Sequence, residues 1–474
     1  MNSKILSHIK KVIAALAVIV ICSPHAAYAA SFFNKDNEEK SLIQRLIDRL
    51  FNVEEEENKY EDAGNFLKNF ISTGSEEKDL ASIMDYINTN IPAGDTKDEM
   101  LATVDTYSLL SSSGNSGFSI GSLIGSLMSI LSPLVDELMG LLGGSSIDAE
   151  AIDANITSTT ASDFTDGEYE VALHANVYKN PNDKEGKWAL VIHPFLMSGK
   201  TMANAVGSLY FEQGYNIMAI DLRGFGDSEG TVALGFLESL DAYDWLVYMN
   251  SDTFKQEYDV EVNEIIVHGT SLGAATTNFL SGIDGMLTDK DAPIKIELPY
   301  TLPELNVVGL VEDCGYITME QFADASFITS LGIGFSEEHF DYYSNAANSL
   351  KHCDVPMLII HGDNDTMVDY EANAPEIAKV VGSEGKGYAY LYKQNNNDKD
   401  PVVTIEGGAH ALIMMGSNDE YTAAVEDFAK NVKNQNNIQQ DADVPDNSAD
   451  DTADDTTDDG GIFEKIKELL SGWF

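Results

Sequence analysis

Short apolar runs alternate with helix-length segments from about Asp163 onward. Each run is about five residues long, which is typical of a strand covered on both faces. Repeated strand–helix units predict a mostly parallel sheet with helices on both faces, in a domain that we place at residues 161–435. Such sheets bind ligands at the carboxyl ends of their strands. The expected strands are residues 169–178, which alternate like an antiparallel strand pair, and residues 188–192, 217–220, 265–267, 307–311, 357–360 and 402–405.

The first 29 residues have the pattern of an export signal. A basic stretch precedes the apolar run 12–22, and Ala27-Tyr28-Ala29 forms a small-x-small cleavage site. Ile21 stands before Cys22, where a lipoprotein site needs a small residue. We therefore expect a signal peptide over residues 1–29, cleavage after Ala29 and no lipid anchor. The expected location is secreted or extracytoplasmic, with the cell surface as an alternative.

Residues 30–160 differ from the rest of the chain and predict a helical N-terminal extension. Residues 41–53 carry apolar side chains at helical spacing with charges between them, as an amphipathic helix does. The uncharged run 118–135 is close to the shortest length that spans a bilayer. We interpret it as a helix or helical hairpin, broken near Pro133, that packs on the sheet domain. A segment that faces lipid or substrate is the alternative.

Charge excludes one class of partner and separates the C-terminal end from the sheet domain. The chain has 28 basic and 78 acidic residues and a net charge of −50, so binding to nucleic acid through a basic surface is excluded. Residues 436–461 are rich in Asp and Thr and predict an acidic disordered linker. Residues 462–474 predict an amphipathic helix, which could dock on a protein or on a membrane surface.

Two cysteines remain after the expected cleavage. The pattern places Cys314 at the end of one parallel strand and Cys353 at the start of the next. The ends of such a strand are about 16 Å apart, whereas a disulfide needs Cα atoms within about 7 Å. We expect two buried, inert thiols.

The strongest chemical motif is G-x-S-x-G. It follows the apolar run 265–267 and consists of Gly269, Ser271 and Gly273, with a helix-compatible segment after it. The two glycines permit a sharp strand-to-helix turn that raises a serine hydroxyl above the sheet. Ser271 is therefore the candidate nucleophile.

A nucleophilic serine needs a base, and the base needs an acid that orients it. His410 follows the strand 402–405 in a glycine-rich loop, and it is the one histidine beyond the candidate acids near residue 365. We assign the acid to Asp365, shortly after the strand 357–360. The alternatives are Asp363 and Asp369 nearby, and Asp313 after an earlier strand is a weaker one.

Acyl transfer also needs two backbone N–H donors for the oxyanion. We expect one from Leu272, the residue after the nucleophile. The other should come from the loop after the strand 188–192. Pro194 has no N–H, so we choose Phe195, with Leu196 as the second choice.

These motifs resemble the α/β-hydrolase superfamily. The stretch 214–230 looks like that family's fourth-strand signature, and GTSLGAATT, EDCGY, HGDND and EGGAHAL follow in the family's order over residues 165–432. The likeness is to exported bacterial esterases and dipeptidyl-peptidase-like hydrolases. It implies an α/β-hydrolase fold with a triad of Ser271, Asp365 and His410. Pro194 departs from the glycine that is usual in the family. Asp221 and Arg223 are expected to be structural.

A small cap is expected over the strand ends. Residues 316–350 are rich in aromatic and small apolar residues, and an insertion between these strands would lie above the serine. Apolar side chains there could form an acyl pocket, although ordinary packing within a cap explains them equally well. They are Phe322, Phe327, Phe335 and Tyr342.

The sequence as a whole predicts an exported serine hydrolase that cleaves carboxylic esters through an acyl-enzyme. We expect no cofactor and no metal, since the sequence contains no zinc-binding, P-loop or dinucleotide motif. The expected partner is a small ester or peptide substrate. A dipeptidyl-peptidase-like serine peptidase is the first alternative. A non-catalytic surface adaptor that keeps the fold is the second.

Overall fold

The structure, a computed structural model, describes the sheet domain and a few residues before it. The described residues are 101–102, 147–164, 170–195, 197–321, 337–365, 367–392, 401–408, 410, 414 and 419–433. Several expectations fall outside them: the signal peptide, most of the extension including the run 118–135, the acidic linker and the C-terminal helix. Among the described residues, no helix has the length and apolarity that a membrane crossing requires.

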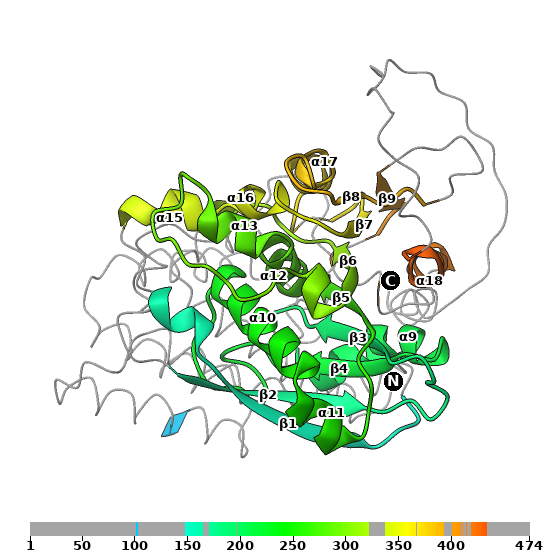
Figure 1. Cartoon of the computed structure of the whole chain (residues 1–474). Coiled ribbons are helices and arrows are strands. Elements are labelled where there is room, and N and C mark those ends of the chain that lie inside the picture. Colours follow the sequence, from blue (N-terminus) through cyan, green and yellow to red (C-terminus); the bar gives the residue numbers. More distant parts are fainter. Residues whose placement is uncertain are drawn as a thin grey trace, which may run out of the picture.

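A nine-stranded sheet forms the centre of the molecule (Figure 1). The strands β3 to β7 run parallel to one another, and β2 joins them through an antiparallel pairing with β4. The order is β1-β2-β4-β3-β5-β6-β7, and β7 pairs with both β8 and β9 along its outer edge. The strands are β1 (Ala151–Ser158), β2 (Val171–Tyr178), β3 (Lys187–Ile192), β4 (Asn216–Ile220), β5 (Glu264–Thr270), β6 (Val307–Asp313), β7 (Pro356–Gly362), β8 (Tyr388–Ala389) and β9 (Val402–Ile405).

Helices cover both faces of this sheet. The α-helices are α8 (Gly199–Met202), α9 (Ser208–Glu212), α10 (Phe236–Asn250), α11 (Asp252–Tyr258), α12 (Leu272–Leu280), α13 (Ile283–Thr288), α15 (Glu337–Tyr343), α16 (Ala347–Leu350), α17 (Tyr370–Val380) and α18 (Asp419–Asn431). A π-helical turn, η2 (Ala203–Gly207), connects α8 to α9. Three 3₁₀ turns complete the described helices: η1 (Thr160–Phe164), η3 (Pro303–Leu305) and η4 (Met319–Gln321).

Side chains of the central strands alternate between two apolar cores, as the two-residue period of a strand requires. On β3, Trp188 and Leu190 pack in the core beneath α10 and α12, whereas Ala189 and Val191 pack in the core beneath α9 and α18. Figure 1 shows α9 and α18 together on the opposite side of the sheet from α10 and α12. Burial on both faces explains why these strands are continuous apolar runs in the sequence.

The expected α/β-hydrolase fold, with a mostly parallel sheet and helices on both faces, is confirmed. Each expected strand from 188–192 to 402–405 lies within an observed strand. The expected strand pair 169–178 is instead the single strand β2, which pairs antiparallel with β1 on one side and with β4 on the other.

One strand lies outside the expected sheet domain. Residues 151–158 fall in the range expected to be a helical extension, but they form β1, an edge strand paired with all of β2. Exposed and buried residues do not alternate regularly along β1, so its sequence has no clear two-residue period. The sheet domain therefore begins before residue 161.

Candidate active site

Ser271 stands in a sharp turn between β5 and α12. Its φ of 56° lies in the left-handed region, a backbone conformation that residues with a Cβ rarely adopt. The flanking glycines leave room for the turn: a Cβ at Gly269 would collide with the Gly273 carbonyl, and a Cβ at Gly273 would collide with the Ile192 carbonyl. The spacing of the motif is therefore set by how closely α12 approaches β5 and β3.

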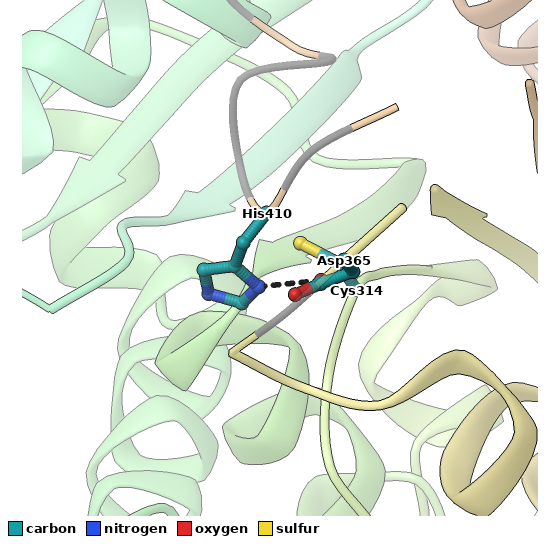
Figure 2. Close-up of side chains that lie close together, drawn as sticks. All are labelled: Cys314, Asp365 and His410. Atoms are coloured by element: carbon teal, nitrogen blue, oxygen red, sulfur yellow. Dashed lines mark hydrogen bonds and ion pairs between the residues drawn. The ribbon is translucent and has the colours of Figure 1, made fainter. Parts of the chain in front are cut away.

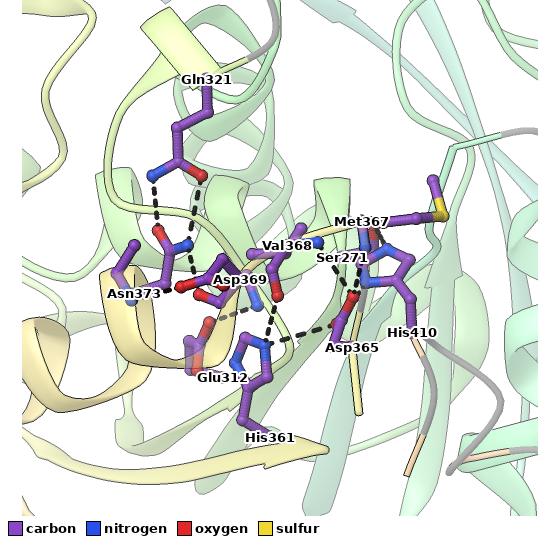
Figure 3. A network of polar contacts seen from close by, with 12 residues as sticks. Ser271, Glu312, Gln321, His361, Asp365, Met367, Val368, Asp369, Asn373 and His410 are labelled. Atoms are coloured by element: carbon purple, nitrogen blue, oxygen red, sulfur yellow. Dashed lines mark hydrogen bonds and ion pairs between the residues drawn. The ribbon is translucent and has the colours of Figure 1, made fainter. Parts of the chain in front are cut away.

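A chain of hydrogen bonds joins Ser271, His410 and Asp365 (Figure 3). The Ser271 Oγ lies 2.6 Å from His410 Nε2, and His410 Nδ1 lies 2.7 Å from Asp365 Oδ2. With a proton on Nδ1, the imidazole donates to the carboxylate and its Nε2 accepts from the serine hydroxyl. The three residues come from the loops that follow β9, β7 and β5, which all end at the same edge of the sheet.

The backbone after β7 fixes the Asp365 carboxylate. Asp365 Oδ1 accepts from the amides of Met367 (2.8 Å) and Val368 (2.9 Å). Burial of this carboxyl raises its pKa, but interactions with His361 and His410 outweigh the burial and hold the pKa of Asp365 well below its usual range. Asp365 is therefore a charged, oriented partner for His410 throughout the neutral range.

The loops that carry the acid and the base are joined to each other. Asp363 N donates to the Ile405 carbonyl (3.2 Å) and Asn364 N donates to the Gly408 carbonyl (3.1 Å). These bonds extend the parallel pairing of β7 with β9. His410 and Asp365 are thus held in register by backbone contacts as well as by their own hydrogen bond.

The structure does not bring the alternative acids to His410. Asp363 is exposed and accepts from Gly407 N. Asp369 caps α17 by accepting from Ala372 N. Asp313 is buried and accepts from the hydroxyls of Thr270 and Tyr421.

The expected oxyanion donors lie next to the serine or in the loop after β3. Leu272 is the first residue of α12, and a residue at this position has no intrahelical acceptor for its N–H. Phe195 is half-buried after β3, and its ring packs edge-on against Phe225. Leu196, the second choice, lies outside the described residues. The oxyanion roles of Leu272 and Phe195 stay predictions.

Two buried residues behind Asp365 were missed by the sequence analysis. His361, on β7, lies 3.4 Å from Asp365 Oδ2, and Glu312, on β6, lies beside it in Figure 3. Both are fully buried. The signal available was the position of His361 four residues before Asp365 and of Glu312 beside the weaker acid candidate.

Cys314 lies beside the pair of acid and base (Figure 2). Its sulfur, an Asp365 oxygen and a His410 nitrogen are within 4.8 Å of one another, which is one of the groupings of metal-ligand side chains in the described chain. The 2.7 Å hydrogen bond between His410 and Asp365 occupies two of these ligands, so we assign no metal to them. Cys314 and Cys353 are both buried, and neither forms a disulfide.

The expected cap is described in part. Phe322, Phe327 and Phe335 lie outside the described residues. Tyr342, on α15, donates its hydroxyl to the Met286 carbonyl of α13 at 2.8 Å and packs edge-on against Tyr343. These contacts are ordinary packing between helices.

Asp221 and Arg223 have the structural roles that the sequence analysis expected. Asp221 accepts from Gly199 N (2.7 Å) and lies 2.7 Å from His174 Nδ1. Arg223 forms a two-pronged ion pair with Asp241, with both N–O distances at 2.6 Å. These buried contacts hold the loop after β4.

Comparison with known proteins finds distant relatives in sequence. No protein-family model matches the chain. It is 27% identical over 167 residues to the lysophosphatidylserine lipase ABHD12 of Macaca fascicularis, which covers 33% of this chain and 36% of that protein. It is 28% identical over 134 residues to the multifunctional-autoprocessing repeats-in-toxin of Vibrio cholerae, which covers 27% of this chain and 3% of the toxin. The chain thus matches only about a third of the length of its lipase relatives.

Comparison with solved structures finds esterases. EstE1, a thermostable carboxylesterase from a metagenomic library, aligns with 65% of this chain and 97% of its own, at 15% identity and a TM-score of 0.44. The Pyrococcus furiosus esterase Pf2001 aligns with 60% of this chain and 92% of its own, at 19% identity and a TM-score of 0.39. The assignment to the α/β-hydrolase fold rests on the strand order and on the strand–serine–helix turn described above.

Proposed function

We propose that this protein is an exported serine hydrolase that cleaves carboxylic esters through an acyl-enzyme. The observation that carries the proposal is the hydrogen-bonded chain from Ser271 through His410 to Asp365, at 2.6 and 2.7 Å. A serine on a strained turn, a histidine within hydrogen-bond reach and a buried carboxylate behind it meet the geometric requirements of nucleophilic catalysis.

Each side chain has one task in this mechanism. The Ser271 oxygen attacks the ester carbonyl while His410 Nε2 takes the hydroxyl proton. Asp365 stabilises the resulting imidazolium, and the N–H groups of Leu272 and Phe195 hold the oxyanion. Collapse of the tetrahedral intermediate breaks the bond to the alcohol, which receives the proton from His410. Water then attacks the acyl-enzyme by the same steps and releases the carboxylic acid.

The relatives and the charge both bear on the substrate. The curated relatives include lipases, which favours an ester over a peptide. The net charge of −50 repels polyanions and anionic membranes. We therefore propose uncharged carboxylic esters as substrates. Export rests on the signal-peptide pattern of residues 1–29, and secretion is part of the proposal.

A fluorophosphonate probe with intact-mass detection tests the proposal. Residues 30–474 are treated as the wild type and as Ser271→Ala, and hydrolysis of aryl esters is measured beside hydrolysis of aminoacyl arylamides. We expect one adduct on the wild type, none on the variant, and turnover of esters only. An unchanged esterase rate in Ser271→Ala would overturn the assignment, and faster arylamide turnover would replace the esterase with a peptidase.

A further inference from the structure

Resting on the proposed function, we propose that Glu312 and His361 are a buried positioning pair that fixes Asp365 and sets the charge Asp365 presents to His410. The pair lies behind the acid, on the side away from the serine (Figure 3). Neither residue reaches a reacting atom, so both would act through Asp365.

His361 ties together the turn that carries Asp365. The His361 Nε2 lies 3.0 Å from the Val368 carbonyl, and it also lies 3.4 Å from Asp365 Oδ2. Val368 N in turn donates to Asp365 Oδ1. The imidazole therefore braces both ends of the turn after β7, with a proton on Nε2. Its loss would let the Asp365 carboxylate move away from His410.

Glu312 supplies a second charge for the same imidazole. One oxygen, Oε1, accepts from Gly315 N at 2.5 Å. The other, Oε2, and His361 Nδ1 are both buried and have no hydrogen-bond partner among the described residues. Figure 3 shows the Glu312 carboxylate beside the His361 ring, and the two groups interact electrostatically. A buried polar atom without a hydrogen-bond partner costs free energy, and the attraction between the carboxylate and a charged imidazole offsets part of that cost.

Electrostatics favours a charged His361. Burial lowers the pKa of His361, but the nearby Asp365 and Glu312 outweigh burial and raise it above its usual value. Burial raises the pKa of Glu312 to about 7, against the effect of His361. The Glu312 carboxyl therefore changes its charge near neutral pH, where the proposed enzyme works, whereas His361 keeps its proton to a higher pH than an ordinary histidine.

Several other titratable groups face His361 and belong in any account of its charge. Those with an electrostatic or ring contact to it are Glu312 and Asp313 on β6, Asp365 in the following loop and Tyr370 on α17, and His410 lies beyond Asp365. Asp365 forms an ion pair with it, with 3.4 Å between His361 Nε2 and Asp365 Oδ2. A positive His361 thus competes with His410 for the charge of one carboxylate.

Two variants separate the positioning role from the electrostatic role. Glu312→Gln removes the anion that favours a charged His361 but keeps the imidazole on Val368, whereas His361→Gln removes both. Without a cation at His361, the whole charge of Asp365 acts on His410. We therefore expect both variants to move the acid limb of the kcat/KM profile to higher pH, and Glu312→Gln to move it less, because the Glu312 carboxyl is already partly protonated at and below pH 7. His361→Gln should also lower kcat roughly ten- to a hundredfold with little change in KM, since the acid is misplaced.

Glu238→Gln is the matched control for removing a buried carboxylate. Glu238 is fully buried and accepts from Gly235 N and Ala233 N in the loop before α10. We expect its pH profile to superimpose on that of the wild type. A superimposable profile for Glu312→Gln, or an equal shift in Glu238→Gln, would overturn the inference.

The readouts distinguish this inference from the proposed function. Turnover that survives Ser271→Ala would overturn the proposed function whatever the pair does. If turnover depends on Ser271 and both pair variants behave like the wild type, only the inference fails.

The low-field proton resonance of the His410–Asp365 hydrogen bond tests the pair without turnover. It should shift in both pair variants and stay unchanged in Glu238→Gln. A cooperative thermal unfolding transition shows that each variant is folded. If His361→Gln does not fold, the pH profile and the proton spectrum of Glu312→Gln still test the inference.

Discussion

The Ser271 amide donates to the Asp313 carbonyl at 2.8 Å, so the turn that carries the serine is fastened to the end of β6. The pairing of β5 with β6 runs up to Thr270 and Asp313, directly before this bond. The sheet therefore imposes the positive φ of Ser271, and a residue with a Cβ holds that conformation at a cost of about 1 to 3 kcal/mol.

Ser271→Gly should relieve this strain. Glycine adopts a positive φ without a Cβ clash, although its more flexible unfolded chain offsets part of the gain. We expect the unfolding free energy of Ser271→Gly to exceed that of Ser271→Ala by about 1 kcal/mol, so the glycine variant should unfold at a higher temperature. Both variants lack the hydroxyl and should be inactive, so Ser271→Ala is the control. A lower unfolding free energy for the glycine variant would show that the turn is not strained.

Replacing the acid should cost more activity than replacing its neighbour. Asp365→Asn cannot accept the Nδ1 proton of His410 as a charged group and favours the wrong tautomer, so kcat should fall about 10³- to 10⁴-fold. Asp369→Asn is the control, because it was an alternative acid and asparagine is also a good helix cap. It should keep the wild-type kcat. Equal losses in the two variants would remove Asp365 from the triad.

Asp313 should make stability depend on pH. Burial raises the pKa of Asp313 to about 6 from an ordinary value of 3.8. Between these values the folded chain holds a proton that the unfolded chain has lost, so the contribution of Asp313 to stability falls as pH rises and is constant above about 6. The slope is at most about 1.4 kcal/mol per pH unit.

Asp313→Asn should abolish this dependence. The amide oxygen still accepts from Thr270 and Tyr421, and the NH₂ group takes the place of Oδ1, which has no partner among the described residues. Urea unfolding at pH 4.5 and 7 should show that the wild type loses stability relative to this variant as pH rises. The exposed Asp252→Asn should track the wild type at both values. An Asp313→Asn variant that also tracks the wild type would contradict the prediction.

Arg223 and Asp241 should matter for folding and not for chemistry. Removing one member of a buried ion pair leaves an uncompensated charge, so Arg223→Ala should lower the unfolding free energy by about 3 to 5 kcal/mol. The double variant Arg223→Met with Asp241→Leu should lose much less. Activity per folded molecule, counted by fluorophosphonate titration, should match the wild type in both variants. A lower activity per titrated site would give Arg223 a role in the reaction.

The central strands were predictable because burial on both faces requires an unbroken apolar run in the sequence. β3 and β5 are such runs. β1 was not predictable, since one face is exposed and its polar residues do not alternate cleanly. β8 has two residues, too few to form a pattern.

The residues of the candidate triad could be proposed from the G-x-S-x-G motif, from the resemblance to the α/β-hydrolase order of serine, acid and histidine, and from the strand ends that they follow, because the carboxyl ends of parallel strands meet at one edge. Their supporting residues could not. His361 and Glu312 become neighbours through the register of β6 on β7, and a register is a tertiary property. A histidine inside an apolar strand is also commonly a core residue, so the position of His361 four residues before Asp365 was too weak a signal to identify its role.

The backbone bonds from Asp363 to Ile405 and from Asn364 to Gly408 make the acid loop and the base loop one mechanical unit. β8 pairs with β7 as well, so the chain between β8 and β9 is attached to this unit at both ends. The length of this segment can therefore change without moving the acid loop or the base loop. New termini or an inserted domain could be introduced there without disturbing the alignment of His410 with Asp365, and a split version of this protein would best be divided there.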